Sequence, residues 1–467
     1  MAGIGFELRL DQEQDSGLLG RLTTYVCAAL ISSGPWIITT GALSLLSLLG
    51  PLLGDDTDYS ALRSLITYAF AFSLITVGVA QMAVTRKVAD VLYAGRPEGV
   101  LPAFTSLTWA VALVQSIVAA VFCALVELPL DTSLVLVALY AIVSMSWVAL
   151  IWLSVTRDYQ RILRAYLYGC FFSVAAVLGL ALSHGATGML AAYTAGQGLT
   201  YALLVRAIVR GVASGPTREL AVFHGLREYP ALVAAGFCYS LAIWVDKLVF
   251  WIVDGIGPHP WIRTHPMYES SCFLAYLTVV PALAVNLIHL ETRFYERYRG
   301  YFDAILDGFT LDEIERRRKR MMDSLREGTV RLLRVQCAIT ALCIALAPSI
   351  VHALEMPEAT VRVFRLCCLG ALFHVLFSIT ILVQLYFDLR RQAMWSTATF
   401  LLLNALLAWW SLNQGVASYG AGYAGAALGS LVVAFALLND GVKNLEYRIF
   451  SSQALVPAQD EAVESPA

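Results

Sequence analysis

The sequence predicts an all-α polytopic membrane protein, with 12 transmembrane helices in two six-helix bundles and both termini in the cytoplasm. Three observations predict this class. First, 58% of the 467 residues are hydrophobic and only 14% are charged, whereas soluble proteins carry about 25% charged residues. Second, 12 apolar segments are long enough to cross a bilayer as helices. Third, lysine and arginine concentrate in alternate connections between these segments.

The apolar segments follow one another with mostly short connections. The first is interrupted at Pro35, which removes a helix hydrogen bond and bends the helix. This bend indicates either a helix that lines an interior path or an ordinary packing kink. The segments lie at about 22–50, 62–84, 104–126, 134–155, 166–183, 187–209, 231–253, 270–290, 335–354, 364–387, 394–413 and 419–438.

The basic residues predict the orientation of the chain. With the N-terminus inside, 27 of the 32 lysines and arginines fall in cytoplasmic connections, 4 fall outside, and Lys247 lies within the membrane. One helix more or fewer in the middle of the chain would destroy this asymmetry. The outer connections are short, and the longest runs from about Asp254 to Glu269, so no soluble domain is expected outside.

These segments also divide the chain into domains. We expect a cytoplasmic lead over 1–21, a first six-helix bundle over 22–210, a cytoplasmic linker over 211–230, a second six-helix bundle over 231–440, and a cytoplasmic tail over 441–467 whose acidic end is disordered. Acidic residues precede the first apolar core, so this span is expected to stay in place as a signal anchor. Two six-helix halves with a cavity between them are a common plan of transporters.

A cytoplasmic helical hairpin is predicted over 291–334, inside the second bundle. Its first helix covers about Thr292–Leu306, and Asp307 and Gly308 end it. Thr310–Glu313 has the form of a capping box that starts the second helix. The hairpin offers two candidate surfaces for docking a partner. The first is the aromatic stripe Phe294, Tyr298 and Phe302, which otherwise packs on the membrane face. The second is the basic run Arg316, Arg317 and Arg318, which otherwise binds anionic headgroups or is a plain positive-inside anchor.

Asp246 and Lys247 are the only acid and base placed deep inside an apolar segment. A charge there costs about 2.5–3.5 kcal/mol, so it needs water or a partner. Neighbouring side chains on a helix point about 100° apart, so we expect that the two cannot neutralise each other and that at least one faces a hydrated cavity. The two interpretations are a residue pair that lines a transport path and a structural ion pair that holds spans together.

Sequence motifs for enzymatic chemistry are absent. The chain has no phosphate-binding glycine-rich loop and no H-E-x-x-H motif, and its nine cysteines include no C-x-x-C pair. We therefore expect no enzymatic activity, no cofactor, no metal and no nucleic-acid partner. The cysteines are interpreted as small apolar packing residues.

Several stretches, in order along the chain, resemble the family of membrane transport subunits of Pel exopolysaccharide systems. They are Met1–Leu8, Ser33–Trp36, Trp244–Lys247, Pro266–Tyr268, Phe273–Leu277 and Glu291–Glu296. The resemblance implies a fold of the multidrug/oligosaccharidyl-lipid/polysaccharide flippase superfamily in a bacterial inner membrane. It also implies export of a growing cationic, galactosamine-rich polysaccharide. The implied partners are a cytoplasmic glycosyltransferase, a membrane regulatory subunit that senses cyclic di-GMP, and a further Pel membrane subunit. The acidic start after Leu10 departs from the more basic start expected of the family.

The resemblance sharpens the candidate path residues, which are Asp246, Lys247, Trp36, Trp244, Pro35 and His374. The carboxylate of Asp246 is expected to attract cationic sugar units, and the rings of Trp36 and Trp244 to stack on sugars. His374 is interpreted as a hydrogen-bonded core residue or a proton relay. Trp251, nearer the outer end, is expected at the membrane interface.

Three functions stay open from the sequence. The leading one is export of a nascent polysaccharide, either by rearrangement of the two bundles or by threading. The second is a flippase for a lipid-linked oligosaccharide or an ion-coupled drug antiporter, which would work without a cytoplasmic glycosyltransferase. The third, from another class, is a membrane scaffold whose hairpin recruits the synthase.

Overall fold

The computed structural model describes residues 18–49, 56–93, 99–155, 159–211 and 221–443. The predicted lead and tail lie almost entirely outside these residues, as does part of the predicted linker, 212–220.

The N-terminal lobe, as we name it, consists of α2 to α6. These helices are α2 (Leu18–Leu49), α3 (Asp56–Tyr93), α4 (Val100–Val126), α5 (Leu130–Val155) and α6 (Tyr159–Gly211). Pro35 lies inside α2, as predicted. Gly185 interrupts α6 with φ 57° and ψ −164°, a conformation that glycine adopts without a Cβ clash. The two arms of α6 on either side of it coincide with the fifth and sixth apolar segments.

The C-terminal lobe consists of α8 to α15 and follows the short helix α7 (Ala221–Glu228). Prolines open α8, α9 and α10, where their missing N–H has no helical partner to lose. The elements are α8 (Pro230–Asp254), α9 (Pro266–Leu277), α10 (Val280–His289), the π-helical turn η3 (Leu290–Phe294), α11 (Tyr295–Leu306), α12 (Leu311–Ala353), α13 (Ala359–Tyr386), α14 (Arg390–Asn413), the 3-10 turn η4 (Val416–Ser418) and α15 (Ala421–Lys443).

The prediction of a helical, multi-pass membrane protein is confirmed. Among the described residues, 10 helices are long and apolar enough to cross a membrane. The number of 12 spans and the side on which each terminus lies stay predictions. One local prediction was incomplete, because β1 (Ile256–His259) and β2 (Ile262–Thr264) form a small antiparallel hairpin in the connection after α8.

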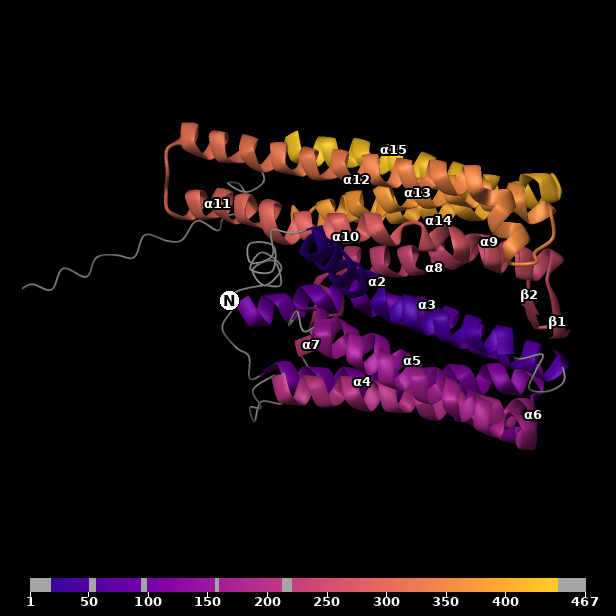
Figure 1. Cartoon of the computed structure of the whole chain (residues 1–467). Helices are drawn as coiled ribbons and strands as arrows, with labels where there is room; N and C mark the ends of the chain where they lie inside the picture. The colour runs from indigo at the N-terminus through magenta and orange to yellow at the C-terminus, as the bar shows by residue number, and fades with distance from the viewer. Residues whose placement is uncertain (1–17, 50–55, 94–98, 156–158, 212–220, 444–467) are drawn as a thin grey trace, which may run out of the picture.

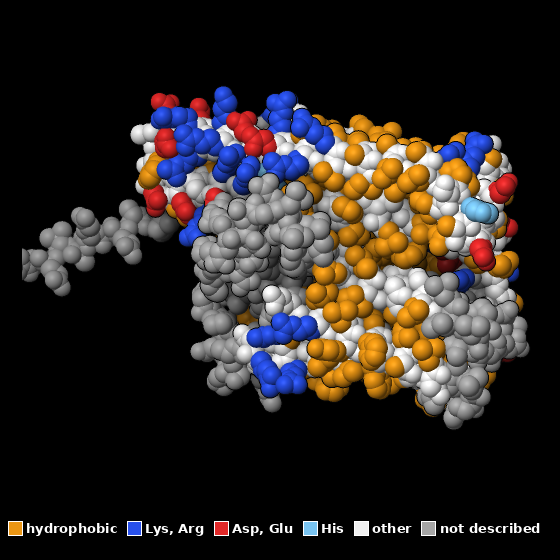
Figure 2. Space-filling model, viewed as in Figure 1, with side chains coloured by type: hydrophobic (Ala, Val, Ile, Leu, Met, Phe, Trp, Pro, Cys, Tyr) orange, Lys and Arg blue, Asp and Glu red, His pale blue; other side chains and the backbone are white. Residues whose placement is uncertain are grey.

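The two lobes lie one above the other in Figure 1, with the β-hairpin at one end and the α11–α12 pair at the other. Hydrophobic side chains cover the middle of the visible face, and lysine and arginine gather at the end where α11 and α12 project (Figure 2). Large apolar side chains such as Trp109, Phe171 and Leu406 are exposed on the two lobes. An exposed apolar belt with basic residues at one end is the surface of a membrane-spanning protein.

The helical hairpin is present and continues two membrane helices. Helix α10 passes through η3 into α11, and α12 is one helix of 43 residues that includes the ninth apolar segment. Asp307 and Gly308 end α11 as predicted, with Gly308 at φ +68°. The capping-box prediction was wrong in its detail. Thr310 occupies the N-cap position of α12, but its side chain makes no capping hydrogen bond.

Candidate functional site

The Asp246–Lys247 pair lies at the centre of the C-terminal lobe on α8. The Nζ atom of Lys247 lies 3.1 Å from each carboxylate oxygen of Asp246 and 3.1 Å from the carbonyl oxygen of Ile243. The expectation that the two side chains cannot neutralise each other was therefore wrong. The angle between neighbouring Cβ directions does not fix the tip of a lysine, because its flexible four-carbon stem carries the ammonium back to the carboxylate.

Tyr268 of α9 completes the surroundings of the carboxylate. Its hydroxyl donates a hydrogen bond of 2.8 Å to Oδ2 of Asp246. Its ring stacks on Phe250 of α8, with centroids 4.0 Å apart and planes inclined by 5°. The pair thus joins α8 to α9, because a tyrosine held by stacking aims its O–H at the charge. Tyr268 lies in the family-like stretch Pro266–Tyr268, but its contact with Asp246 could not be predicted, since the contact depends on how two helices pack.

Neither charge faces an open passage in this conformation. The Asp246 side chain is 0% exposed and that of Lys247 is 8% exposed. The expectation of a hydrated cavity against at least one of them is not met here. Mutual neutralisation and the bond from Tyr268 satisfy the buried charges instead, which is the condition under which such charges are tolerated.

An aromatic bridge connects the pair to the N-terminal lobe. Nζ of Lys247 lies 5.5 Å from the ring centroid of Tyr276 and 5.9 Å from that of Trp244. Tyr276 in turn meets Trp36 of α2 edge-on at 6.5 Å, and Trp36 also contacts Phe273 at 5.7 Å. Trp36 is 38% exposed. A predicted path residue of one lobe therefore touches aromatic residues of the other, one ring away from the buried lysine.

His374 of α13 belongs to the same cluster. Its Nδ1 atom lies 2.8 Å from the hydroxyl of Tyr423, and its ring lies 6.0 Å from the ring of Tyr276. Phe400 packs against it at 5.0 Å. These contacts are those of a hydrogen-bonded core histidine; a relay role stays a prediction.

The two lobes meet along α3 and α8, where small residues bring the backbones together. A Cβ atom added to Gly236 would overlap the carbonyl oxygen of Gly78, and one added to Gly78 would overlap Ser240. Small residues allow such close approach of membrane helices. Pro35 lies in α2, and α2 packs on α10 through Ala28, Ala284 and Ile288.

Charged contacts tie the lobes together at the end where α11 and α12 project. Lys87 of α3 lies 2.8 Å from Glu228 of α7, and hydrogen bonding to this lysine lowers the pKa of the Glu228 carboxyl. Tyr229 donates a 2.7 Å hydrogen bond to Asp90. These contacts hold the end of α3 against α7 and the start of α8.

At the opposite end, α3 is bound to the β-hairpin. The Tyr68 hydroxyl donates to the carbonyl oxygen of Arg263 at 2.8 Å and accepts from the Arg263 N–H at 2.9 Å. The Tyr68 ring stacks on Trp251 at 4.7 Å. Trp251 is 2% exposed and donates to Glu269, so its expected place in an interfacial aromatic belt was wrong.

The docking candidates on the hairpin are largely used within the protein. Phe294 is 0% exposed, and the Tyr298 hydroxyl donates to the carbonyl oxygen of Tyr386 at 3.0 Å. Phe302 packs on Tyr298 at 4.7 Å. The aromatic stripe therefore packs on the chain itself, mainly on the end of α13. This packing explains why the residues of the stripe are apolar.

The three arginines of the basic run differ in their contacts and in their exposure. Arg317 braces the hairpin by donating to the carbonyl oxygen of Gly300 at 2.9 Å and pairing with Glu313 at 3.0 Å. Arg316 is 65% exposed, with Glu313 at 3.4 Å. Arg318 is half-buried. Of the three, Arg316 presents most of its charge to the surroundings. No group of three or more metal-ligating side chains occurs among the described residues.

Comparisons with known proteins agree on the family and the fold. The sequence model of the PelG family of exopolysaccharide exporters (EPS-E) matches residues 1–450. A MATE family multidrug resistance transporter of the MOP superfamily, in an outward-facing conformation, superposes with a TM-score of 0.66 at 14% identity, covering 90% of this chain and 96% of that one. An inward-facing MATE structure gives 0.54 at 12% identity, covering 91% and 96%. A MOP superfamily transporter from Pyrococcus furiosus gives 0.59 at 14% identity, covering 90% and 95%. No curated protein matches the chain.

Proposed function

Because the chain belongs to the PelG family of exopolysaccharide exporters, we propose that it moves a nascent polysaccharide from the cytoplasm to the periplasm along the boundary between its two lobes. The observation that carries this proposal is the family match over residues 1–450. The fold is that of a MOP superfamily transporter, and the protein is a multi-pass membrane protein of the bacterial inner membrane. Family and fold point to transport rather than to an enzyme.

The aromatic bridge is the proposed contact with sugar. Trp36 is partly exposed on α2 and faces Phe273 and Tyr276 of the other lobe. Flat aromatic faces bind sugar rings by stacking. When the lobes separate, these rings become the wall of the path, and Lys247 lies directly behind Tyr276.

The finer substrate proposal is a cationic, galactosamine-rich polymer. Its support is the carboxylate of Asp246, which holds a single ammonium group, that of Lys247, at 3.1 Å. A sugar ammonium that arrives beside Tyr276 competes with Lys247 for the same carboxylate. In this proposal Lys247 keeps the site neutral while no substrate is present, which is the condition for burying Asp246 at low cost.

The proposed topology has 12 spans with both termini in the cytoplasm, and the α11–α12 pair on the cytoplasmic side. Its support is the distribution of lysine and arginine, which gather at the end where α11 and α12 project (Figure 2). The two arms of α6 on either side of Gly185 supply the fifth and sixth spans.

The proposed partners are a cytoplasmic glycosyltransferase, a membrane regulatory subunit that senses cyclic di-GMP, and a further Pel membrane subunit. The exposed basic side of α12 is the proposed docking face for the glycosyltransferase. Arg316 is the most exposed of the three arginines in the basic run. Processive synthesis by this enzyme would drive the polymer forward, so no motif for ATP hydrolysis is needed in this chain.

Reconstitution tests the proposal. Vesicles that contain this chain and the glycosyltransferase, with sugar nucleotide outside, are expected to accumulate labelled polymer that an external glycosidase cannot reach. Vesicles with the enzyme alone are expected to leave all label accessible. Equal protection in the two preparations would contradict the proposal.

Ion-coupled antiport is a second candidate, favoured by one observation. The chain superposes on MATE multidrug transporters, and it buries a carboxylate inside a membrane helix, which marks ion pathways in many transporters. An antiporter would move its substrate without the glycosyltransferase and would stop when the ion gradient is collapsed. Uptake of label in the reconstituted vesicles with and without an ionophore separates the two candidates.

A further inference from the structure

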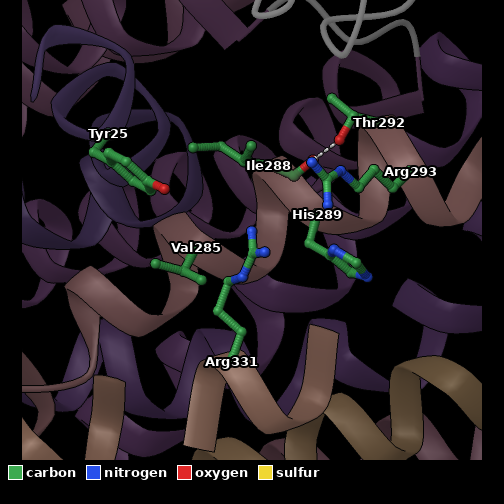
Figure 3. A pocket seen from close by; sticks show the side chains of 7 residues that line it. All are labelled: Tyr25, Val285, Ile288, His289, Thr292, Arg293 and Arg331. Carbon is green, nitrogen blue, oxygen red and sulfur yellow. Dashed lines mark hydrogen bonds between the residues drawn. The ribbon is translucent and has the colours of Figure 1, made fainter. Parts of the chain in front are cut away.

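A cavity of about 310 Å³ opens beside the junction of the two lobes, where α10 ends. It lies between α2, α10, η3 and α12, near the end at which α11 and α12 project. The residues that line it are Tyr25, Val285, Ile288, His289, Thr292, Arg293 and Arg331 (Figure 3).

The polar lining of the cavity is basic. Arg293 and Arg331 come from η3 and α12, and their guanidinium groups converge on the same space (Figure 3). Within the described part of the chain, neither forms a salt bridge. Glu327 on α12 lies within electrostatic reach of His289, but it is exposed and does not line the cavity. Two arginines against one space, with no acidic residue among the described residues that line it, attract an anion.

His289 supplies a third polar group, held in one orientation. It is 5% exposed, and its Nε2 atom lies 2.8 Å from the carbonyl oxygen of Ser324. A carbonyl oxygen only accepts, so Nε2 carries the hydrogen. The other nitrogen, Nδ1, is buried without a hydrogen-bond partner among the described residues. The bond to Ser324 therefore fixes the ring, and His289 is one of the residues that line the cavity.

The backbone around His289 leaves space for its imidazole ring. Gly328 on α12 leaves room for the imidazole ring, because a Cβ atom there would overlap it. The π-helical turn Leu290–Phe294 directly follows His289 and carries Thr292 and Arg293. Insertions of this kind in α-helices are frequent at functional sites.

We propose that this cavity binds a phosphate group, carried by an anionic lipid headgroup or by a soluble phosphate ester. Arginine matches the geometry of phosphate oxygens with paired N–H donors, and the side chain of His289 lines the same cavity. Val285 and Ile288 offer an apolar wall to the remainder of the ligand. The proposal is separate from polysaccharide export and does not depend on it.

A ligand in this cavity would touch both lobes. Tyr25 belongs to α2, and the other lining residues belong to the C-terminal lobe. The cavity adjoins the contact of Ala28 with Ala284 and Ile288. Binding therefore stabilises the arrangement in which α2 packs on α10, because a ligand favours the state that holds its contacts.

The test uses the purified full chain and no export readout. The variant Arg293→Gln/Arg331→Gln removes the two cavity arginines, and Arg326→Gln/Arg334→Gln removes two exposed arginines of α12 that do not line it. One arm places each protein in nanodiscs of phosphatidylcholine with or without phosphatidylglycerol. The second arm adds inorganic phosphate or pyrophosphate in phosphatidylcholine alone. Thermal unfolding and retained lipid, counted by native mass spectrometry, are the measurements.

The wild-type chain and the control are expected to be stabilised in one of the two arms. The cavity variant is expected to bind about tenfold more weakly or worse, as loss of charge-assisted hydrogen bonds requires. A response to phosphatidylglycerol assigns the phosphate to a lipid, and a response to free phosphate or pyrophosphate assigns it to a soluble ester. Absence of any response in the wild type, or an equal loss in the control, overturns the proposal.

Discussion

The protein holds charge in two contrasting ways. On α8, Asp246 and Lys247 are buried and neutralise each other at 3.1 Å. At the end of α10, Arg293 and Arg331 are exposed to a cavity and have like charge. Charges that are buried and paired keep the interior of the C-terminal lobe intact, whereas charges of one sign at a wet cavity are available to a ligand. In this chain, therefore, the buried charges are satisfied by each other, and the charges at the cavity remain available to a ligand.

The largest expected effect comes from breaking the buried pair. Asp246→Asn leaves the ammonium of Lys247 without its carboxylate in a dry interior. Removing one partner of a buried pair costs about 3–5 kcal/mol, so we expect a large fall in thermal stability and in membrane abundance. Tyr268→Phe removes only the hydrogen bond to Asp246 and is expected to cost less, about 1.5–3 kcal/mol. Thermal unfolding of the purified variants measures both.

A double substitution separates structure from transport. Asp246→Leu with Lys247→Met replaces the pair by apolar side chains, which is often neutral for stability. We expect abundance to return close to wild type while polymer export stays low. Normal export by this double variant would leave the pair with a structural role alone.

A smaller effect is expected where the cavity is built into the fold. Gly328→Leu forces a side chain into the space of the His289 ring, and overpacking of this kind costs about 1–3 kcal/mol. It also displaces the ring of His289, a residue that lines the cavity. Thermal unfolding measures the cost. A stability equal to wild type would show that the His289 ring does not pack against Gly328 as described.

The smallest effect is expected at the cavity arginines themselves. Arg331→Gln removes an exposed charge with no ion partner among the described residues, so stability without ligand is expected to change by less than about 0.5 kcal/mol. Arg334→Gln, three residues further along α12, is the matched control. A loss comparable to that of Asp246→Asn would erase the distinction between the two regions.

Much of the helical architecture could be predicted from the sequence, because hydrophobic length and charge distribution are local. The break between the fifth and sixth segments and the hairpin end at Gly308 lie where the sequence indicated, and Pro35 lies inside α2, where a bend stays a prediction. The family was also predictable, since its short motifs recur in order along the chain. Contacts between distant segments were not.

The sequence identified the charged residues of the site but not the contacts that these residues make. Asp246 stood out because it is charged within an apolar span, but Tyr268 and Tyr276 are ordinary aromatic residues until α9 packs on α8. The cavity brings Tyr25, His289 and Arg331 together from three regions of the chain, and no spacing in the sequence relates them. The π-helical turn after His289 also has no periodicity that distinguishes it from an α-helix.

The central claim is that polysaccharide passes between the two lobes, which requires α2 and α10 to separate. Ala28 and Ala284 pack together at their contact and are both buried, so cysteines at these two positions can be cross-linked, with each single cysteine as a control. In the reconstituted vesicles, we predict that cross-linking Ala28→Cys to Ala284→Cys stops the accumulation of protected polymer and that reduction restores it. Undiminished accumulation by fully cross-linked protein would contradict the account.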